Sequence, residues 1–238
     1  MGAILRYIEE NGISADLTNL YPFHSKRAWI TQIPKEFDFE HSHLPTQLFH
    51  AGLISSPEDE IETGFPWHLL TGEPLIYISM GTMVNGSAER LRLVTQAAQG
   101  NGRQVVVSMG PHLHRAELGY LAANTITVSY APQIKLFKYA NLCITHGGLN
   151  TVLESLYEGV PLVVLPIIFD QPGVAARVAF FGVGDFLNAE KLDRDSLCQM
   201  IERVLSDPAY RRAAQRMQTK IAWQNGAQRA ARHLHEMW

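Results

Sequence analysis

The strongest constraint on the fold is an alternation of two residue patterns from position 75 onward. Short apolar runs rich in β-branched residues alternate with amphipathic stretches of helix length. Runs that are apolar throughout are typical of strands covered by helices on both faces. The alternation therefore predicts repeated βα units and an α/β fold with a doubly wound parallel sheet. We expect its strands at residues 75–80, 104–109, 125–129, 142–145 and 162–165, with a shorter sixth at 184–187.

The amphipathic stretches between these strands predict the helices. They cover residues 88–99, 150–158, 174–181, 194–205 and 208–221. Asp193 is suited to the N-cap of the fourth helix, and Pro208 to the first position of the fifth. Asn225 and Gly226 form a break before a last amphipathic helix at 227–237.

The first 53 residues have a different character. A helical start at 3–10 is followed by scattered prolines and aromatics, with strand-like runs only at 28–33 and 47–50. This is too little for an independent core. Residues 54–73 contain serine, proline, glycine and an acidic run, which is typical of an exposed linker. We therefore expect a fragment of one domain (1–53), a linker (54–73), a complete α/β domain (74–222) and a final helical segment (223–238).

Charge and apolar content exclude several classes of protein. Twenty Lys and Arg against 23 Asp and Glu give a net charge of −3, which disfavours nucleic acid as a partner. The longest apolar run, 159–169, contains Pro161 and Pro166 and is shorter than the roughly 20 residues of a membrane-spanning helix. Cys143 and Cys198 have no metal-ligand or disulfide-scaffold spacing. With no secretory signal pattern at the start, the sequence predicts a cytoplasmic protein without a transmembrane segment.

Ligands of open α/β sheets bind at the carboxyl ends of the strands, so the loops there carry the candidate site. The first strand leads to Gly81 and Thr82, whose hydroxyl can donate to a phosphate oxygen or cap a helix. The third strand leads to Tyr130, Ala131 and Gln133. The tyrosine ring can stack on a base and the amide can bind a sugar hydroxyl. A tyrosine that is simply half-buried at the rim is the alternative.

The fourth strand leads through His146 and Gly148 directly into a helix. The amide hydrogens and positive dipole end of a helix start suit a phosphate group. Asn150 and Thr151 can add donors, and Glu154 shares their helical face one turn further on, where a carboxylate suits the hydroxyls of a ribose. The alternatives are a buried histidine, a helix cap and a solvated glutamate.

Asp170 and Gln171 follow the fifth strand. A carboxylate beside an amide can bind neighbouring hydroxyls of a hexose, and Asp170 is equally suited to cap the next helix. The remaining histidines show no spacing typical of a catalytic or metal site.

In combination these motifs resemble the donor-sugar signature of nucleotide-diphosphate-sugar glycosyltransferases with the two-domain B-type fold. The resemblance rests on the order and spacing of Tyr130 to Gln133, His146 to Thr151, Glu154, Gly159 with Pro161, and Asp170 with Gln171. It covers about residues 20–238. The family's usual tryptophan is Tyr130 here. Residues 145–151 and 169–178 are most similar to bacterial zeaxanthin glucosyltransferases.

The resemblance implies a role for each candidate residue. Uracil would lie on Tyr130 and bind the Ala131 backbone, ribose would bind Gln133 and Glu154, and the hexose Asp170 and Gln171. Pyrophosphate would bind Thr82, His146, Gly148, Asn150 and Thr151. The implied reaction is inverting, needs no metal or cofactor, and moves a hexose such as glucose from a UDP-sugar to a lipophilic hydroxylated acceptor such as a carotenoid, which a peripheral membrane contact could supply.

The resemblance also implies that the catalytic base lies on an N-terminal acceptor domain, of which residues 1–53 would be a remnant and toward which the final helix would cross. No catalytic residue is therefore expected in this chain. Two other interpretations remain open. One is a nucleotide-sugar binding module without transfer activity; the other is a nucleotide-sugar epimerase, which shares the fold but is disfavoured by the Tyr-x-Pro-Gln and Asp-Gln elements.

Overall fold

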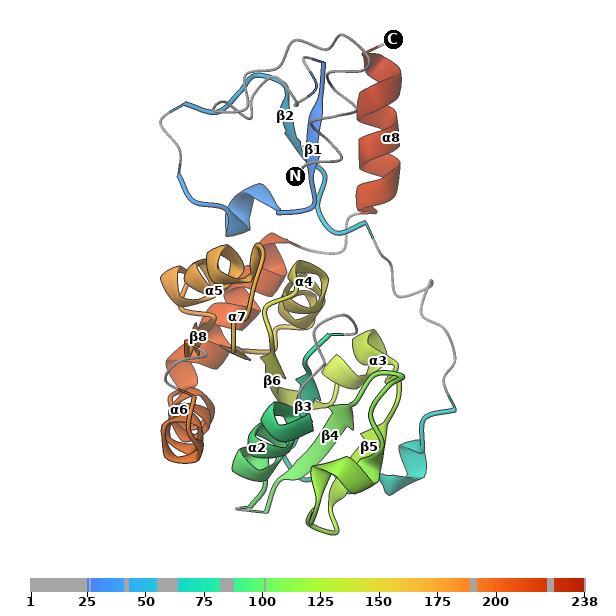
Figure 1. The fold of residues 1–238 in the computed structure, drawn as a ribbon. Coiled ribbons are helices and arrows are strands. Elements are labelled where there is room, and N and C mark those ends of the chain that lie inside the picture. Colours follow the sequence, from blue (N-terminus) through green and yellow to red (C-terminus); the bar gives the residue numbers. More distant parts are fainter. Residues whose placement is uncertain are drawn as a thin grey trace, which may run out of the picture.

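The computed structural model describes residues 25, 27–40, 43–54, 64–81, 88–100, 102–188, 192–221 and 225–237. Figure 1 shows two parts of unequal size. The larger part holds a six-stranded sheet with helices on both faces. The smaller part holds two short strands and the last helix. Two parts of the sequence prediction lie outside the described residues: the helix at 3–10 and the site residue Thr82.

The six strands of the larger part are all parallel. They are β3 (Leu75–Ser79), β4 (Gln104–Ser108), β5 (Thr125–Val128), β6 (Ala140–Thr145), β7 (Leu162–Val164) and β8 (Gly184–Phe186). Their order in the sheet is β5-β4-β3-β6-β7-β8. The chain winds outward in one direction from β3 and in the other from β6, so the predicted doubly wound α/β fold is confirmed. The crevice beyond the carboxyl ends of β3 and β6 is the position where such sheets bind ligands.

Helices cover both faces of this sheet (Figure 1). On one face α2 (Ala88–Ala98) and α6 (Arg194–Ser206) pack against Ile76, Ile78 and Ile144. The other face is covered by α3 (Gln133–Phe137), α4 (Leu149–Tyr157), α5 (Gln171–Phe180) and α7 (Pro208–Lys220). Asp193 caps α6 by accepting the Ser196 amide hydrogen at 2.9 Å, as predicted.

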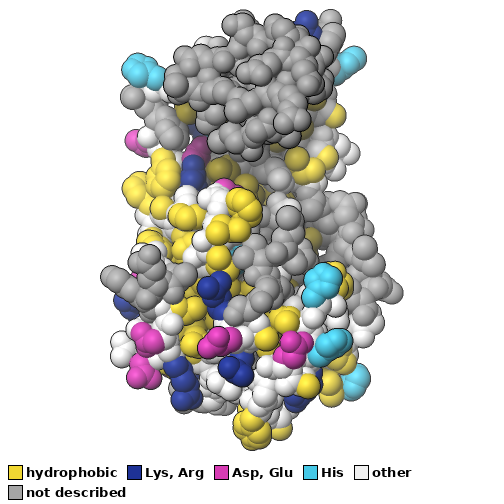
Figure 2. Space-filling model, in the orientation of Figure 1, with side chains coloured by type: hydrophobic (Ala, Val, Ile, Leu, Met, Phe, Trp, Pro, Cys, Tyr) yellow, Lys and Arg dark blue, Asp and Glu magenta, His cyan; other side chains and the backbone are white. Residues whose placement is uncertain are grey.

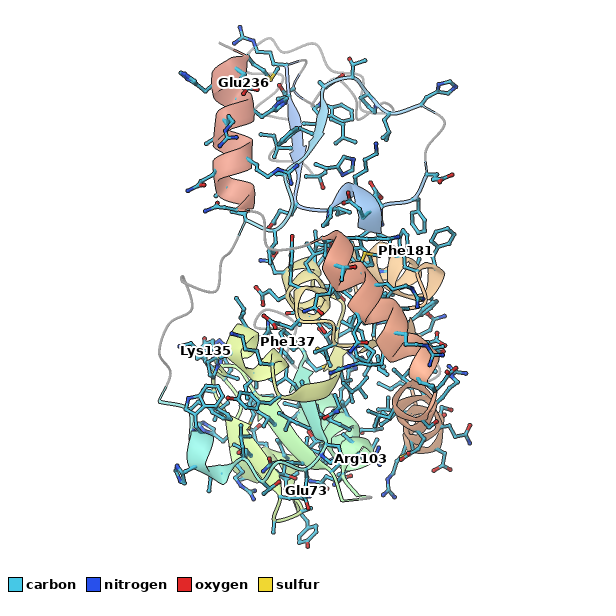
Figure 3. All side chains as sticks on the ribbon, turned by 180° about the vertical axis from the view of Figure 1, so that it is seen from behind. Glu73, Arg103, Lys135, Phe137, Phe181 and Glu236 are labelled. Atoms are coloured by element: carbon cyan, nitrogen blue, oxygen red, sulfur yellow. The ribbon has the colours of Figure 1, made fainter. Side chains whose placement is uncertain are left out.

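Two helices differ from the sequence prediction. The short helix α3 is absent from the predicted helices; its residues Ile134, Leu136 and Phe137 are buried, and this burial favours the helix. In Figure 3 Phe137 points into the core, whereas Lys135 on the same helix points outward. The other helix, α5, begins at Gln171 rather than at residue 174, with Pro172 in its first turn.

The smaller part consists of β1 (Trp29–Thr31), β2 (Leu48–His50) and α8 (Gly226–Glu236). The two strands pair in parallel. Helix α8 lies beside them: the Phe49 and His233 rings stack with centroids 4.1 Å apart, and Arg229 Nη1 donates to the Ala51 carbonyl at 2.9 Å. The Gly226 amide donates to the Leu53 carbonyl, and a Cβ on Gly226 would lie 2.4 Å from that oxygen. Glycine therefore permits the close approach with which α8 begins.

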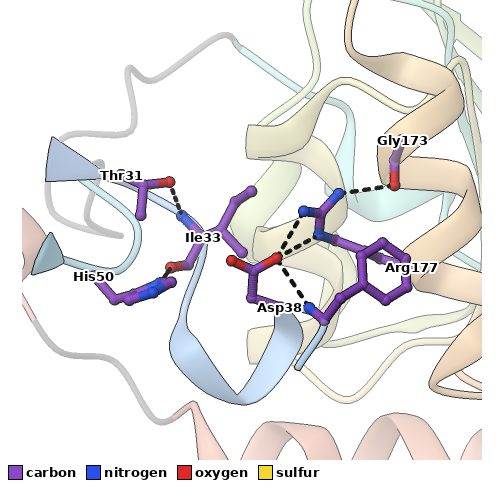
Figure 4. A network of polar contacts seen from close by, with 7 residues as sticks. Thr31, Ile33, Asp38, His50, Gly173 and Arg177 are labelled. Carbon is purple, nitrogen blue, oxygen red and sulfur yellow. Dashed lines mark hydrogen bonds and ion pairs between the residues drawn. The ribbon is translucent and has the colours of Figure 1, made fainter. Parts of the chain in front are cut away.

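A short segment between β1 and β2 connects the smaller part to the larger one. Phe37, at the end of the 3-10 turn η2 (Lys35–Phe37), is fully buried against Phe181. Next to it, Asp38 accepts from Arg177 at 2.7 Å, while Arg177 also donates to the Gly173 carbonyl at 3.0 Å and lies over the Phe39 ring (Figure 4). We call this set of contacts the Asp38–Arg177 clasp. It connects the N-terminal segment to α5.

One residue, Phe65, departs from the expectation of an exposed linker over residues 54–73. Phe65 is only 6% exposed and belongs to the core of the larger part. Its ring meets Trp67 edge-on, and the Gln104 side chain donates to the Leu69 carbonyl at 2.8 Å. Most of residues 64–73 are exposed, and residues 55–63 lie outside the described residues. Within the described residues, no helix has the length and apolar character needed to cross a membrane.

Candidate functional site

All the predicted site residues that the structure describes follow β5, β6 and β7, in the loops there or in the helices α3, α4 and α5 that come next. His146, directly after β6, lies between two glycines. A Cβ on Gly81 would be 2.7 Å from His146 Cε1, and a Cβ on Gly148 would be 2.8 Å from the same atom. Gly81 also has φ +77°, which favours glycine. The two glycines therefore leave the space that the imidazole occupies at the central crevice of the sheet.

The protonation of His146 is set by opposing effects. Partial burial lowers its pKa, while a hydrogen bond to the Ser79 backbone and the nearby Asp170 carboxylate act in the opposite direction. The ring is thus mostly neutral near pH 7, with one N–H directed to the Ser79 carbonyl. It is only partly buried, so it is not simply a core histidine. A second N–H for an anion requires the ring to take up a proton.

The start of α4 is open to an anion. Its N-cap residue is Gly148, which has no side chain to accept the amide hydrogens of the first turn. Asn150 and Thr151 are the second and third helical residues, so neither is the cap that the alternative proposed. Asn150 is exposed and Thr151 partly buried. Backbone donors, the dipole and these two side chains together favour a phosphate group.

Glu154 lies one turn further along α4 and is only 7% exposed. The alternative of a solvated glutamate is therefore wrong. Gln133, at the start of α3, donates from Nε2 to Glu154 Oε2 and to Thr151 Oγ1, the latter at 3.4 Å. Gln133 Oε1 in turn accepts from the Tyr77 hydroxyl at 3.1 Å. The amide and the carboxylate expected to bind ribose hydroxyls are thus in direct contact.

Sequence reasoning did not identify Tyr77. It is in the middle of an apolar strand, where a tyrosine is most simply explained as a core residue. The signal that could have identified it is its hydroxyl, because a buried tyrosine oxygen needs a polar partner.

Tyr130 follows β5, and 49% of its side-chain surface is exposed. Pro132, two residues further on, is buried and restricts the backbone that follows the ring. An aromatic ring that is half open to solvent and rigidly attached at a strand end can stack on a planar base.

The structure gives Asp170 and Gln171 different environments. Gln171 is 3% exposed, and its Oε1 accepts from the amides of Ile167 and Ile168 at 2.8 and 3.0 Å. Its carbonyl is therefore used to build the loop, which leaves its amide nitrogen as the group for a ligand. Asp170 is exposed at the N-cap position of α5 but makes no capping hydrogen bond with its side chain, so the cap alternative is not realised.

The loop that Gln171 holds also exposes apolar side chains. Phe169 has φ +59°, the only non-glycine residue with positive φ among those described, and is 78% exposed. Ile168 and Phe180 are also exposed. In Figure 2 hydrophobic side chains gather at the level of α5, whereas charged side chains gather below it over α2 and α6. Among the described residues, no three His, Cys, Asp or Glu side chains form a group that could hold a metal ion.

Comparison with known proteins agrees with this geometry. Residues 11–221 match the family described as UDP-glucoronosyl and UDP-glucosyl transferase. The chain is 32% identical over 172 residues to the uncharacterized UDP-glucosyltransferase YojK of Bacillus subtilis (strain 168), covering 72% of this chain and 42% of that protein. It is 27% identical over 214 residues to the zeaxanthin glucosyltransferase of Pantoea ananas, covering 89% of this chain and 49% of that enzyme.

A solved structure shows the same arrangement. CalG4, the calicheamicin glycosyltransferase, superimposes with a TM-score of 0.77 at 26% identity, over 99% of this chain and 60% of that one. The fold is therefore the B-type glycosyltransferase fold. The chain belongs to the UDP-glucoronosyl and UDP-glucosyl transferase family. It spans about half the length of the curated relatives it matches.

Proposed function

We propose that this chain is the donor-binding half of an inverting glycosyltransferase that takes a hexose from a UDP-sugar. One observation carries the proposal. The groups expected to bind the donor follow β5, β6 and β7 in the chain order of the family signature. They are a half-exposed ring, an amide in contact with a carboxylate, an open helix start with a histidine, and an exposed carboxylate.

Each part of a UDP-sugar has a counterpart in this arrangement. Uracil stacks on Tyr130 beside the Ala131 backbone, and the ribose hydroxyls bind the pair of Gln133 and Glu154. The hexose hydroxyls bind Asp170 and the amide nitrogen of Gln171. The diphosphate lies at the start of α4, bound by Thr82, His146, Gly148, Asn150 and Thr151.

We propose that no metal is needed for binding. The diphosphate charge is offset by the amide hydrogens and dipole of α4 and by His146, which becomes a stronger donor when it is protonated. Affinity for UDP should therefore be the same with EDTA as without it. A loss of affinity in EDTA would contradict this part of the proposal.

The acceptor is proposed to be a lipophilic hydroxylated molecule, of which a carotenoid is one example. The exposed apolar side chains of Ile168 and Phe169, directly before the hexose residues, support this class. We place the catalytic base on the part of the relatives that this chain does not span, and the protein in the cytoplasm, where the free Cys143 and Cys198 remain reduced. A transient membrane contact would deliver such an acceptor.

Calorimetric titration of the chain with UDP, UDP-glucose, dTDP-glucose and GDP-mannose tests the donor assignment. We expect UDP and UDP-glucose to bind and GDP-mannose to bind much more weakly, because the single ring of Tyr130 and the adjacent backbone suit a pyrimidine. Equal binding of all four ligands, or of none, would contradict the proposal. Sugar transfer catalysed by the 238-residue chain alone would show that the base lies within it.

A further inference from the structure

Tyr77 lies on β3, at the centre of the sheet, and its side chain is on the face covered by α3 and α4. It is 1% exposed, and its ring meets Phe137 edge-on with centroids 5.4 Å apart. The ring is thus fixed by packing. Its hydroxyl ends beneath Gln133 and donates to Oε1 of that amide.

Two hydrogen bonds fix which way the Gln133 amide faces. The Glu154 carboxylate only accepts, so Nε2 of Gln133 lies toward α4; Oε1 then lies toward the sheet, where the Tyr77 hydroxyl donates to it. Burial raises the pKa of Tyr77 well above its usual value, so the hydroxyl remains a donor at any pH the protein tolerates. The Gln133 amide is thus held from both ends, by Tyr77 at Oε1 and by Glu154 and Thr151 at Nε2.

The orientation matters for the chemistry of Glu154. A nearly buried carboxylate needs donors to hold it in place, and Gln133 supplies one to Oε2. A carboxylate held in place by such a donor keeps its further acceptor positions fixed for a ligand hydroxyl. Without the Tyr77 hydroxyl the Gln133 carbonyl would lack this donor, and the Gln133 side chain would be freer to turn away from Glu154.

We propose that Tyr77 is a positioning residue of the ribose subsite: through Gln133 it holds the Glu154 carboxylate in the place where it accepts the ribose hydroxyls. This inference rests on the proposed function, since it assumes that Glu154 binds ribose. Tyr77 itself touches no ligand in this scheme, and its effect reaches the ribose only through the amide.

The test compares the affinity of the chain for UDP with its affinity for 2′-deoxy-UDP. In Tyr77→Phe the ratio of the two affinities should fall by about fivefold, the change that corresponds to one neutral hydrogen bond of about 1 kcal/mol. Binding of inorganic pyrophosphate should be unchanged. The matched control is Tyr157→Phe, because Tyr157 is also a buried tyrosine, at the far end of α4, with its hydroxyl bonded to the backbone of Leu53.

A second pair of variants tests whether Tyr77 acts through Gln133. In a Gln133→Met background, the further change Tyr77→Phe should leave the ratio unaltered, because the link is already broken. Should Tyr77→Phe not fold, Gln133→Met alone must lower the ratio by at least the same factor.

The outcomes separate this inference from the proposed function. A wild-type chain that binds UDP and 2′-deoxy-UDP equally well overturns the assignment of ribose to Glu154, and with it the basis of the inference. A wild-type chain that prefers UDP, with Tyr77→Phe retaining the whole preference or Tyr157→Phe losing as much of it, overturns the role of Tyr77 alone.

Discussion

The two parts of the molecule are stabilised in different ways. In the larger part every residue of β3 is buried, and α4 buries six of its residues. In the smaller part no residue of β1 or β2 is buried, and α8 buries only Gly226. The larger part therefore has a core of its own, whereas the described strands and helix of the smaller part are joined by partly exposed contacts. Such contacts contribute less stability per residue, since little apolar surface leaves water.

The largest effect we predict separates two phenylalanines of the N-terminal segment. Phe37 is fully buried in the core of the larger part, so Phe37→Ala should lower the free energy of unfolding by about 4 kcal/mol. Phe49 on β2 is partly exposed, and Phe49→Ala should cost about 1 kcal/mol. Denaturant unfolding followed by circular dichroism measures both. Equal losses would show that the smaller part has a core of its own.

A second prediction concerns ligand binding, which we assign to the larger part alone. His146→Ala should weaken UDP-glucose binding by about 2 kcal/mol through loss of a charge-assisted hydrogen bond. The matched substitution His233→Ala, on α8, should leave the affinity unchanged although it removes the stacking on Phe49. A comparable loss in His233→Ala would mean that both parts contribute to the donor site.

The lowered pKa of His146 gives this binding a pH dependence. Because the free protein holds the ring neutral and the diphosphate favours its protonated form, UDP-glucose should bind more tightly as the pH falls from 8 toward 6, with proton uptake. Without ligand the sign is opposite: the unfolded chain takes up the proton first, so stability falls as the pH drops below about 6.5. Calorimetry in buffers of different ionisation enthalpy measures the uptake, which His146→Ala should abolish.

A further prediction tests the Asp38–Arg177 clasp, which joins the two parts. Both partners of the Asp38–Arg177 pair are mostly buried, at 12% and 17% side-chain exposure. Asp38→Asn should therefore lower the free energy of unfolding by about 1.5 kcal/mol. The control is Asp185→Asn, which breaks the more exposed pair with Arg203 and should cost about 0.5 kcal/mol or less. If the two substitutions cost the same, the clasp is no more than a surface ion pair.

The smallest effect should appear at Asp170. Asp170→Asn should weaken UDP-glucose binding by about 1 kcal/mol and leave UDP binding unaffected, because an amide accepts hydroxyl hydrogens on one terminal atom only, whereas a carboxylate accepts on both. The melting temperature should not change, since the Asp170 side chain makes no capping hydrogen bond. An equal loss of UDP affinity would mean that Asp170 acts on the diphosphate site, through the effect of its charge on His146.

The same difference between the parts explains what the sequence could predict. All six strands of the larger sheet were expected within two residues of their observed ends, because a strand buried on both faces is apolar throughout. The helix α3 was missed because five residues are too few to show a helical period. The burial of Phe65 was missed because the neighbouring polar run obscured it.

Within the site, the residues assigned to the ligand were accessible to sequence reasoning and most of the contacts that support them were not. His146, Asn150 and Glu154 follow a recognisable spacing along the chain. The contact of Tyr77 with Gln133 joins residues 56 positions apart, and the partners of the Gln171 carbonyl are backbone amides, which have no sequence signature. Such contacts exist only once the strands are assembled.

The burial of Phe37 also decides where this chain can be divided. By sequence order the natural place to separate the nucleotide-binding sheet from the preceding segment is the polar stretch before residue 64. A chain shortened there would lose Phe37 and Asp38, and its Phe181 and Arg177 would be left facing solvent. A separable unit suited to domain exchange between relatives must therefore begin before Lys35 or carry residues 35–39 along with the sheet, although they precede it in the sequence by more than thirty positions.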